Sequence, residues 1–406
     1  MVGMSQARHK AAALFAAGAV LCAVVLTASS SVSPSFAQRG GGPATFSLGG
    51  DTTLVHPGNT SGTAAQATTT GQDGFGFVNI PIGAGVKLRQ LNTLATDFKF
   101  VVGSCSAGSP RFTVNVTNGT INSSVFFYLG PPPSYTGCAA GSYASSGNLA
   151  TPTSLVDASA LPGGAFNEPY SQVQADFGDY TITAVHLDVD SRSAGEQTVD
   201  FDNTNVNGKL VTYEPEHGIS FLIEQTAGSV KVKEPGERGF EDLNNLNNGG
   251  NVLVNTVVDT RGGRLEVTAA TGNFAQTTPD TSVVFYDGLI RLRQRGARNA
   301  PATAKLVGKL RCPKGAGAKA KAGKSSVATT SRKRRRRRIW GSGSGNYSTS
   351  GSGGTGSLRG TTWLTRDTCR GTFFKVTEGL GISVLDFDLG QKVNLGPGQS
   401  YFARNR

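Results

Sequence analysis

A stretch near the C-terminus, residues 358–403, constrains the fold more than any other part of the sequence. Apolar and polar residues alternate in it in short bursts: Phe374 and Val376 would point to one face, and Phe373 and Lys375 to the other. Because successive side chains of a strand point to opposite faces, this alternation, rich in Thr, Val and Phe, predicts strands. Glycines between the bursts predict turns. The stretch therefore predicts a β domain.

Short motifs in the C-terminal half resemble the FecR-type extracytoplasmic domain. Those similar to the second half of that family's pattern are Gly360-Thr361-Thr362, Gly371-Thr372-Phe373-Phe374-Lys375-Val376, Glu378-Gly379 and Gly396-Pro397-Gly398-Gln399. Residues 228–232 and 259–267 are similar to its first half. The resemblance implies a FecR-like β domain and a sensor that relays a signal. The family's regulators also have a cytoplasmic N-terminal segment and a retained transmembrane helix, and this sequence shows neither, which argues against signalling.

Residues 1–37 predict a secretory signal peptide. A start with two cations and no acid precedes an apolar run of 16 residues, which is short for a transmembrane span. Ser35 and Ala37 place small residues where signal peptidase requires them, so we expect cleavage after Ala37 and a flexible leader over 38–43. The mature protein is expected to be secreted, extracellular or associated with the cell surface.

A lipoprotein signal at Cys22 is the alternative, and the bulky Leu21 before it argues against that alternative. No later apolar run reaches the roughly 18 residues of a membrane span. We therefore expect no transmembrane helix in the mature chain.

Residues 44–213 predict a β-sandwich. Short runs of β-branched and aromatic residues alternate there with turn signals such as Asn118-Gly119 and Asn207-Gly208, without a clear helical period. The length of this region fits a jelly roll better than a minimal immunoglobulin-like module.

The run 198–208, which contains Asp202-Asn203-Thr204-Asn205-Val206, resembles the last strand of jelly-roll carbohydrate-binding modules. The resemblance implies glycan binding and allows a structural Ca²⁺. Asp200 and Asp202 would share a strand face and are weak candidates for its oxygen ligands. Solvated charges on a strand are the alternative, and no other cofactor is expected.

Tyr135 and Tyr143 are candidates for stacking on sugar rings. They lie on either side of Cys138, close to the proline run 131–133. Packing within the loop is the alternative.

Residues 219–312 and 339–406 predict a second, FecR-like β domain that begins after the polar link 214–218. The insertion 313–338 interrupts it. The insertion lacks apolar periodicity and is expected to be disordered, because it cannot bury enough surface to offset its ordering entropy.

The positive charge of the chain is concentrated in one region. The formal net charge is +12, yet residues 288–366 contain 20 Lys or Arg and no Asp or Glu. The densest part is the run of Arg332, Lys333, Arg334, Arg335, Arg336, Arg337 and Arg338. We rank an anionic envelope polymer or membrane surface first as its partner, no partner second and nucleic acid third.

Four cysteines remain after the expected cleavage: Cys105, Cys138, Cys312 and Cys369. An even number in an oxidising compartment predicts two disulfides, for which three connectivities exist. We prefer Cys105–Cys138 and Cys312–Cys369, since each pair then lies within one predicted domain. Metal binding is the alternative, but no C-x-x-C spacing or nearby His accompanies these cysteines.

No catalytic motif occurs in the sequence. The mature chain has three histidines and no G-x-S-x-G, H-E-x-x-H or P-loop pattern. The leading hypothesis is a secreted, non-enzymatic protein that binds a cell-wall or surface glycan and associates with anionic envelope polymers. A FecR-like sensor and a glycan-cleaving enzyme are the alternatives, and the sequence predicts no oligomeric state.

Overall fold

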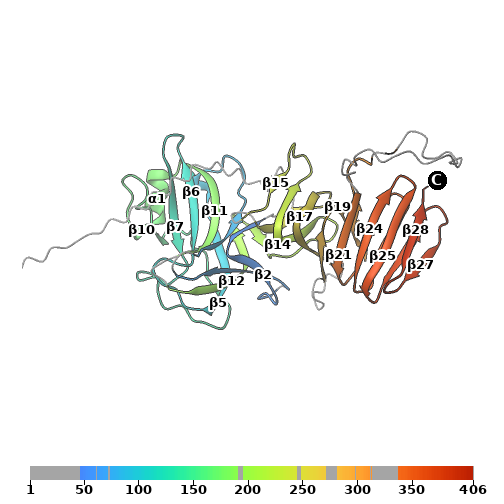
Figure 1. Cartoon of the computed structure of the whole chain (residues 1–406). Coiled ribbons are helices and arrows are strands. Elements are labelled where there is room, and N and C mark those ends of the chain that lie inside the picture. The colour runs from blue at the N-terminus through green and yellow to red at the C-terminus, as the bar shows by residue number, and fades with distance from the viewer. Residues whose placement is uncertain are drawn as a thin grey trace, which may run out of the picture. The chain divides into compact units, whose positions relative to one another are not determined.

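The computed structural model describes residues 46–405 apart from 61, 72–73, 191–194, 245–247, 271–280, 298, 311 and 313–336. All described residues belong to one compact unit, Pro34–Arg406. They form 28 strands, one α-helix and one 3-10 helix, which confirms the all-β class (Figure 1). The predicted signal peptide 1–37, the leader 38–43 and residues 313–336 of the insertion lie outside the described residues.

The N-terminal half is a sandwich of two antiparallel sheets. One sheet has the order β1 (Ser47–Gly50), β4 (Gly76–Ile80), β11 (Thr181–Val189), β6 (Arg111–Thr117) and β7 (Asn122–Tyr128). The other has the order β2 (Thr52–Val55), β3 (Ala64–Thr69), β12 (Gln197–Val206), β5 (Leu94–Val102) and β8 (Ala144–Ser145), with β13 (Lys209–Val211) also paired to β12. A small pair, β9 (Leu155–Val156) and β10 (Glu168–Pro169), and the 3-10 helix η1 (Leu88–Gln90) lie outside these sheets. The jelly-roll assignment stays a prediction.

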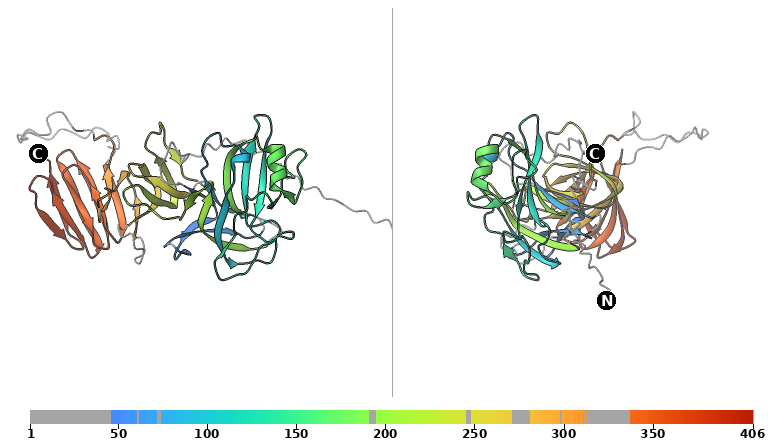
Figure 2. Two further views of the ribbon diagram at one scale, coloured as in Figure 1. Left: turned by 180° about the vertical axis from the view of Figure 1, so that it is seen from behind. Right: turned by 90° about the vertical axis from the view of Figure 1, so that its left-hand side faces the viewer.

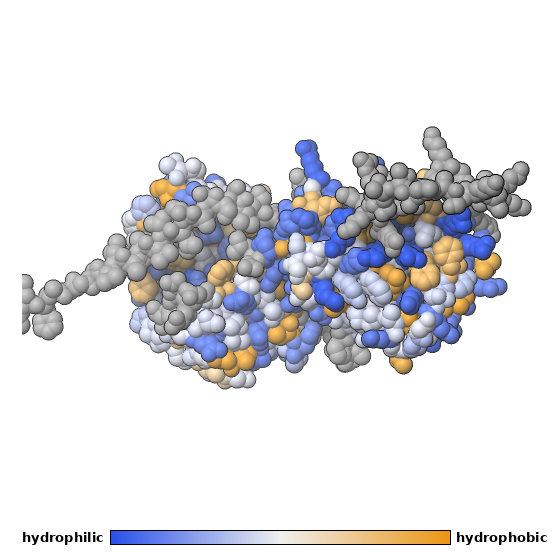
Figure 3. Space-filling view, in the orientation of Figure 1, coloured by the Kyte–Doolittle hydropathy of each residue, from blue (hydrophilic) through white to orange (hydrophobic). Residues whose placement is uncertain are grey.

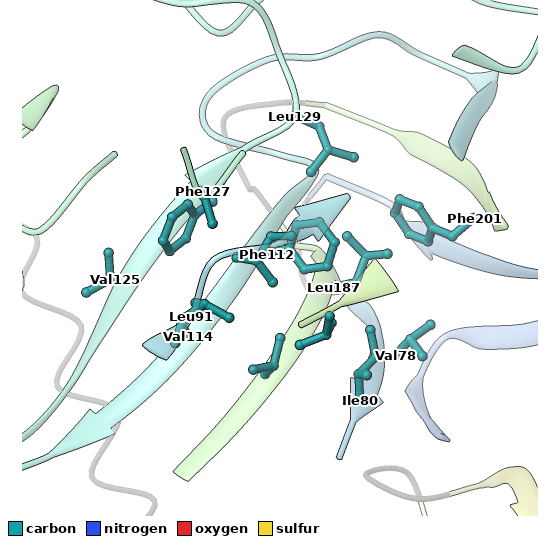
Figure 4. Close-up of a cluster of buried hydrophobic side chains, with 14 of the residues drawn as sticks. Val78, Ile80, Leu91, Phe112, Val114, Val125, Phe127, Leu129, Leu187 and Phe201 are labelled. Atoms are coloured by element: carbon teal, nitrogen blue, oxygen red, sulfur yellow. The ribbon is translucent and has the colours of Figure 1, made fainter. Parts of the chain in front are cut away.

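Alternation along the strands builds the core between these two sheets. Phe112 and Leu187 from one sheet and Phe201 from the other are fully buried and lie together (Figure 4). The alternate residues of the same strands, such as Asp188 next to Leu187, point to the outer face instead. The buried surface of these side chains is the main stabilising term for the half.

One helix was not expected from the sequence. Helix α1 (Tyr170–Phe177) follows Pro169 and buries Tyr170, Val173 and Phe177 against the sandwich. This spacing of three and four residues is typical of a short amphipathic helix. The hydroxyl of Tyr170 donates to the carbonyls of Leu88 and Leu91, at 2.9 and 3.0 Å, so the helix also holds η1 in place.

The C-terminal half is built on two long paired strands, β14 (Ser220–Lys233) and β17 (Val257–Ala269). Two series of strands, which we call branches, continue from different parts of β17. Residues 264–269 of β17 begin what we call the ladder branch, which continues through β18 (Thr281–Tyr286), β21 (Arg337–Gly343), β24 (Thr361–Thr368), β25 (Gly371–Gly379) and β28 (Ser400–Arg404). Residues 257–259 begin the groove branch, which continues through β19 (Leu289–Arg293), β20 (Ala302–Leu306), β22 (Tyr347–Ser350), β23 (Gly354–Leu358), β26 (Ile382–Asp386) and β27 (Lys392–Leu395). Strands β15 (Glu241–Asp242) and β16 (Gly249–Leu253) pair with β14, and β16 also pairs with β1.

The two branches pack face to face around a second hydrophobic core (Figure 2). Trp363 of the ladder branch is fully buried and donates its indole N–H to Thr349 Oγ1 of the groove branch, at 2.9 Å. Gly341 is the register partner of Trp363, and a Cβ at that position would lie 2.3 Å from the indole ring. A glycine is therefore required in β21 to accommodate this tryptophan.

Both cysteine pairs preferred from the sequence are bonded in the structure. Cys105 is joined to Cys138 and Cys312 to Cys369, with Cα–Cα distances of 5.1 and 5.5 Å. The second bond places Cys312 beside the end of β24. It thus links the residue just before the insertion to the end of the strand that pairs with β21, where the described chain resumes.

Candidate functional site

A groove of about 1070 Å³ lies on the outer face of the groove branch. Strands β20, β22 and β23 form its floor. Alternation turns Ala304, Tyr347 and Gly356 inward, toward the core, and leaves hydroxyl-bearing and basic side chains on the outside. The outward residues that line the groove on these strands are Thr303, Lys305, Ser348, Ser350, Thr355 and Ser357.

Strand register arranges the groove residues in two rows. Arg293, Thr303, Ser348 and Ser357 are successive partners across β19, β20, β22 and β23. Thr303 Oγ1 and Ser348 Oγ are hydrogen-bonded at 2.8 Å. This row thus begins with a cation and continues with hydroxyl groups.

The second row contains Arg291, Lys305, Ser350 and Thr355. Its first two members are both cations. The described residues that line the groove include the basic side chains Arg293, Arg295, Lys305 and Arg337 and no carboxylate. An anion entering the groove would therefore meet no repelling charge from its lining.

Arg337 marks the end of the groove where the insertion rejoins the fold. It forms an ion pair with Asp367, its register partner on β24, whose side chain is completely buried. Asp367 also accepts hydrogen bonds from the backbone N–H of Ser352 and the hydroxyl of Thr372, at 2.9 and 2.6 Å. This pair holds Arg337 in place.

The position of Arg337 and Arg338 corrects part of the prediction for the basic run. Both were expected in the disordered insertion, but they are the first two residues of β21. Arg338 forms an ion pair with Asp287, so both are neutralised by carboxylates distant in sequence. Arg332, Lys333, Arg334, Arg335 and Arg336 lie outside the described residues, and an anionic partner for them stays a prediction.

A second row of side chains crosses the outer face of the ladder branch. Arg264, Tyr286, Trp340, Leu364 and Lys375 are successive register partners across β17, β18, β21, β24 and β25, and we call them the ladder row. The Arg264 guanidinium lies 4.2 Å from the centre of the Tyr286 ring, and the Tyr286 and Trp340 rings are nearly parallel with centres 6.2 Å apart. Figure 3 shows hydrophilic and hydrophobic residues interspersed over the C-terminal strands.

A neighbouring row on the same face brings two arginines together. Arg338 and Arg366 are direct register partners, and Arg366 is followed by Phe373 and Phe402. The Arg366 guanidinium lies 4.9 Å from the centre of the Phe373 ring. Its Nε is buried and has no hydrogen-bond partner among the described residues. Like charges directly opposite one another destabilise a sheet, and the ion pair of Arg338 with Asp287 offsets only the charge of Arg338.

The structure corrects the prediction that Tyr135 stacks on a ligand. Tyr135 is only 5% exposed, and its ring packs against Tyr128 and Phe166, with ring centres 4.6 and 5.9 Å away. Its hydroxyl donates to Asn167 Oδ1 at 2.5 Å. Tyr135 is therefore part of a loop core and cannot present a ring face to a sugar.

Tyr143 is half-buried, and Lys99 Nζ lies 4.9 Å from the centre of its ring. Burial of the hydroxyl, with the charges of Asp200 and Asp202 as smaller causes, raises the pKa of Tyr143. One ring face is thus covered by an ammonium group. A stacking role for Tyr143 stays a prediction.

Asp200 and Asp202, the weak calcium candidates, accept hydrogen bonds from protein donors. Lys99 Nζ lies 2.6 Å from Asp200, and Gln66 Nε2 donates to the same carboxylate at 2.7 Å. Backbone N–H groups of Asn59 and Asn203 donate to Asp202, at 2.8 and 2.7 Å. In the described ranges no group of three or more His, Cys, Asp or Glu side chains is placed to hold a metal ion.

Comparison with known protein families, with curated proteins and with solved structures gave no match for this chain. The FecR and carbohydrate-module resemblances therefore stay predictions. Within the described ranges, no helix is both long and apolar enough to cross a membrane.

Proposed function

We propose that this chain is a non-enzymatic extracellular protein whose groove binds an acidic polysaccharide. One observation carries the proposal: a groove of about 1070 Å³ is lined by cations and hydroxyl groups and, in its described lining, by no carboxylate. Guanidinium groups match the geometry of carboxylates. Hydroxyl groups can both donate to and accept from sugar hydroxyls.

The extracellular assignment is supported by the cysteines. Two disulfides join Cys105 to Cys138 and Cys312 to Cys369, and such bonds persist in oxidising compartments. The N-terminal sequence adds the pattern of a secretory signal. Neither the sensor nor the glycan-cleaving enzyme is favoured by a specific feature of the described residues.

The test is binding of the mature protein to polygalacturonate at low and high salt, with neutral dextran as the control polymer. Replacing two groove cations, Arg293→Gln with Lys305→Gln, should weaken binding about tenfold or more. The charge-matched control, Arg89→Gln with Arg238→Gln, should change it less than about threefold, because exposed cations outside the site contribute little. Equal losses in both variants would contradict the proposal.

A third variant, in which residues 313–336 are deleted, separates the groove from the basic run. We expect this variant still to bind polygalacturonate through the groove, so adding the groove substitutions to it should weaken its binding as they do in the full mature chain. If the deletion abolishes binding and the groove substitutions do not, the basic run is the polymer-binding element and the proposal is wrong.

A further inference from the structure

The ladder branch carries cations that the fold does not neutralise. Among the described residues, Arg264 and Arg366 have aromatic rings as neighbours but no ion pair with a carboxylate. Both belong to rows that strand register fixes across the sheet. This arrangement is independent of the groove, because the residues lie on other strands.

Stacking on a ring prepares an arginine for binding. The planar guanidinium lies against the aromatic face and keeps its N–H groups at the edge, where they can meet a carboxylate in two parallel hydrogen bonds. The Arg264 guanidinium lies over the Tyr286 ring and that of Arg366 over the Phe373 ring, at 4.2 and 4.9 Å from the ring centres. The Nε of Arg366 is buried without a hydrogen-bond partner in the described residues, so only the terminal N–H groups of this guanidinium are counted as donors to a ligand.

The opposition of Arg338 and Arg366 points to a ligand of negative charge. Asp287 compensates Arg338, but no carboxylate among the described residues compensates Arg366. The charge of Arg366 therefore remains for an anionic ligand to compensate.

The dimensions suit an extended chain. The ladder row crosses five strands, and with neighbouring strands about 4.8 Å apart it spans roughly 19 Å. Leu364 and the rings of Tyr286 and Trp340 lie between the cations at its two ends. Leu364 offers apolar surface to the C–H faces of sugar rings.

Single-stranded nucleic acid fits this face less well. Its bases require an open aromatic face on which to stack. Tyr286 is flanked by Arg264 on one adjacent strand and Trp340 on the other, both in direct register. The Phe373 ring is likewise covered by Arg366.

We infer that the outer face of the ladder branch is a second binding surface for a carboxylated polysaccharide, on the opposite side of the C-terminal sandwich from the groove. One molecule of this protein would then hold two polymer strands and cross-link them. The second surface goes beyond the proposed function, whereas cross-linking rests on it, because it requires the groove to be occupied as well.

Two measurements on the full mature chain test the inference. Calorimetry with a short oligogalacturonide should give two sites per chain, and light scattering should show that the protein aggregates long polygalacturonate. The ladder variant, Arg264→Gln with Arg366→Gln, should retain one site and lose cross-linking. The charge-matched control, Arg89→Gln with Arg238→Gln, should behave as the natural chain does.

The outcomes separate this inference from the proposed function. The inference is wrong if the ladder variant still shows two sites. It is also wrong if the natural chain shows a single site and the groove substitutions remove it. In both cases the groove proposal stands. If the groove substitutions leave both sites intact, the groove proposal fails. The lysine variant, Arg264→Lys with Arg366→Lys, keeps the charge but not the planar fork, so its ladder-site affinity should fall about threefold to tenfold. Single-stranded DNA that displaces the oligogalacturonide from the ladder site would overturn the choice of ligand.

Discussion

The two halves of the molecule treat their charged side chains differently. In the N-terminal sandwich, charges are satisfied within the fold: Asp200 is paired with Lys99 and Asp190 with Arg111, at 2.6 and 2.7 Å. The C-terminal sandwich also contains ion pairs, such as Arg337–Asp367, but its Arg264 and Arg366 lie on a sheet face beside aromatic rings without a carboxylate partner in the described residues.

The difference indicates where a charged partner would bind. A satisfied carboxylate has little left to offer a ligand, since its lone pairs already accept protein donors. A stacked guanidinium without a counterion keeps its donors available. Asp190 and Asp200 therefore stabilise the fold, whereas Arg264 and Arg366 are suited to recognition.

The largest effect is expected at Asp367, whose side chain is completely buried. Asp367→Asn would leave Arg337 without its counterion and should lower the free energy of unfolding by about 3 kcal/mol. The control is Asp179→Asn, which breaks the exposed Arg89–Asp179 pair and should cost less than about 1 kcal/mol. Urea unfolding measures the change in the free energy of unfolding for both variants. Equal changes would show that burial does not determine how much these ion pairs stabilise the fold.

The next effect compares the halves directly. Asp200→Asn should destabilise the protein by about 2 kcal/mol, because Asp200 is 2% exposed and Lys99 would lose its counterion. Arg366→Gln removes a charge that has no ion pair and that opposes Arg338, so it should leave stability unchanged or raise it by up to about 0.5 kcal/mol. If Arg366→Gln is as destabilising as Asp200→Asn in urea unfolding, the proposed contrast between the two halves is wrong.

A smaller effect depends on pH. Burial, with Glu237 and Glu241 as smaller causes, raises the pKa of Glu234 to about 7 in the folded state, above its unfolded value of 4.5. The folded chain then binds more protons than the unfolded chain between these values, so stability should fall as the pH rises from about 4.5 to 7.

The expected loss is about 1–2 kcal/mol, since solvent reaches part of the Glu234 side chain. Glu234→Gln should remove this slope when urea unfolding is compared at pH 5 and pH 7.5. A slope that survives in the variant would assign the pH dependence to other groups, among them Asp188, whose pKa is also raised by burial.

The smallest effect is expected from calcium. Asp200 and Asp202 already accept from Lys99, Gln66 and backbone N–H groups, so adding millimolar CaCl₂ or EDTA should shift the melting temperature by less than about 1 °C. A rise of several degrees with CaCl₂ that Asp202→Asn abolishes would show that the N-terminal half does bind the ion. The contrast between the halves would then have to be revised.

Local pattern in the sequence predicted the all-β class and the preferred cysteine pairs. Alternation in residues 358–403 corresponds to strands β24, β25, β26, β27 and β28, because period two follows directly from strand geometry. Helix α1 was missed although Tyr170, Val173 and Phe177 have helical spacing, since eight residues between strand-like runs give a weak signal.

The candidate surfaces could not be predicted, because they depend on register. Trp340 lies beside Tyr286 and Leu364 only through pairings between segments distant in sequence. The same limit explains Arg337 and Arg338. Their composition resembles the rest of the basic run, and their carboxylate partners, Asp367 and Asp287, become neighbours only in the folded sheet.

The described residues on either side of 313–336 are both anchored to the end of β24. Cys312 is bonded to Cys369, at the end of β24, and Arg337 pairs with Asp367 on the same strand. A peptide bond cut anywhere within 313–336 would thus leave a single covalent molecule with both branches intact. Since the entropy of closing a loop grows only slowly with its length, this position should also tolerate foreign sequence, and so offers a place to attach a tag or a second domain.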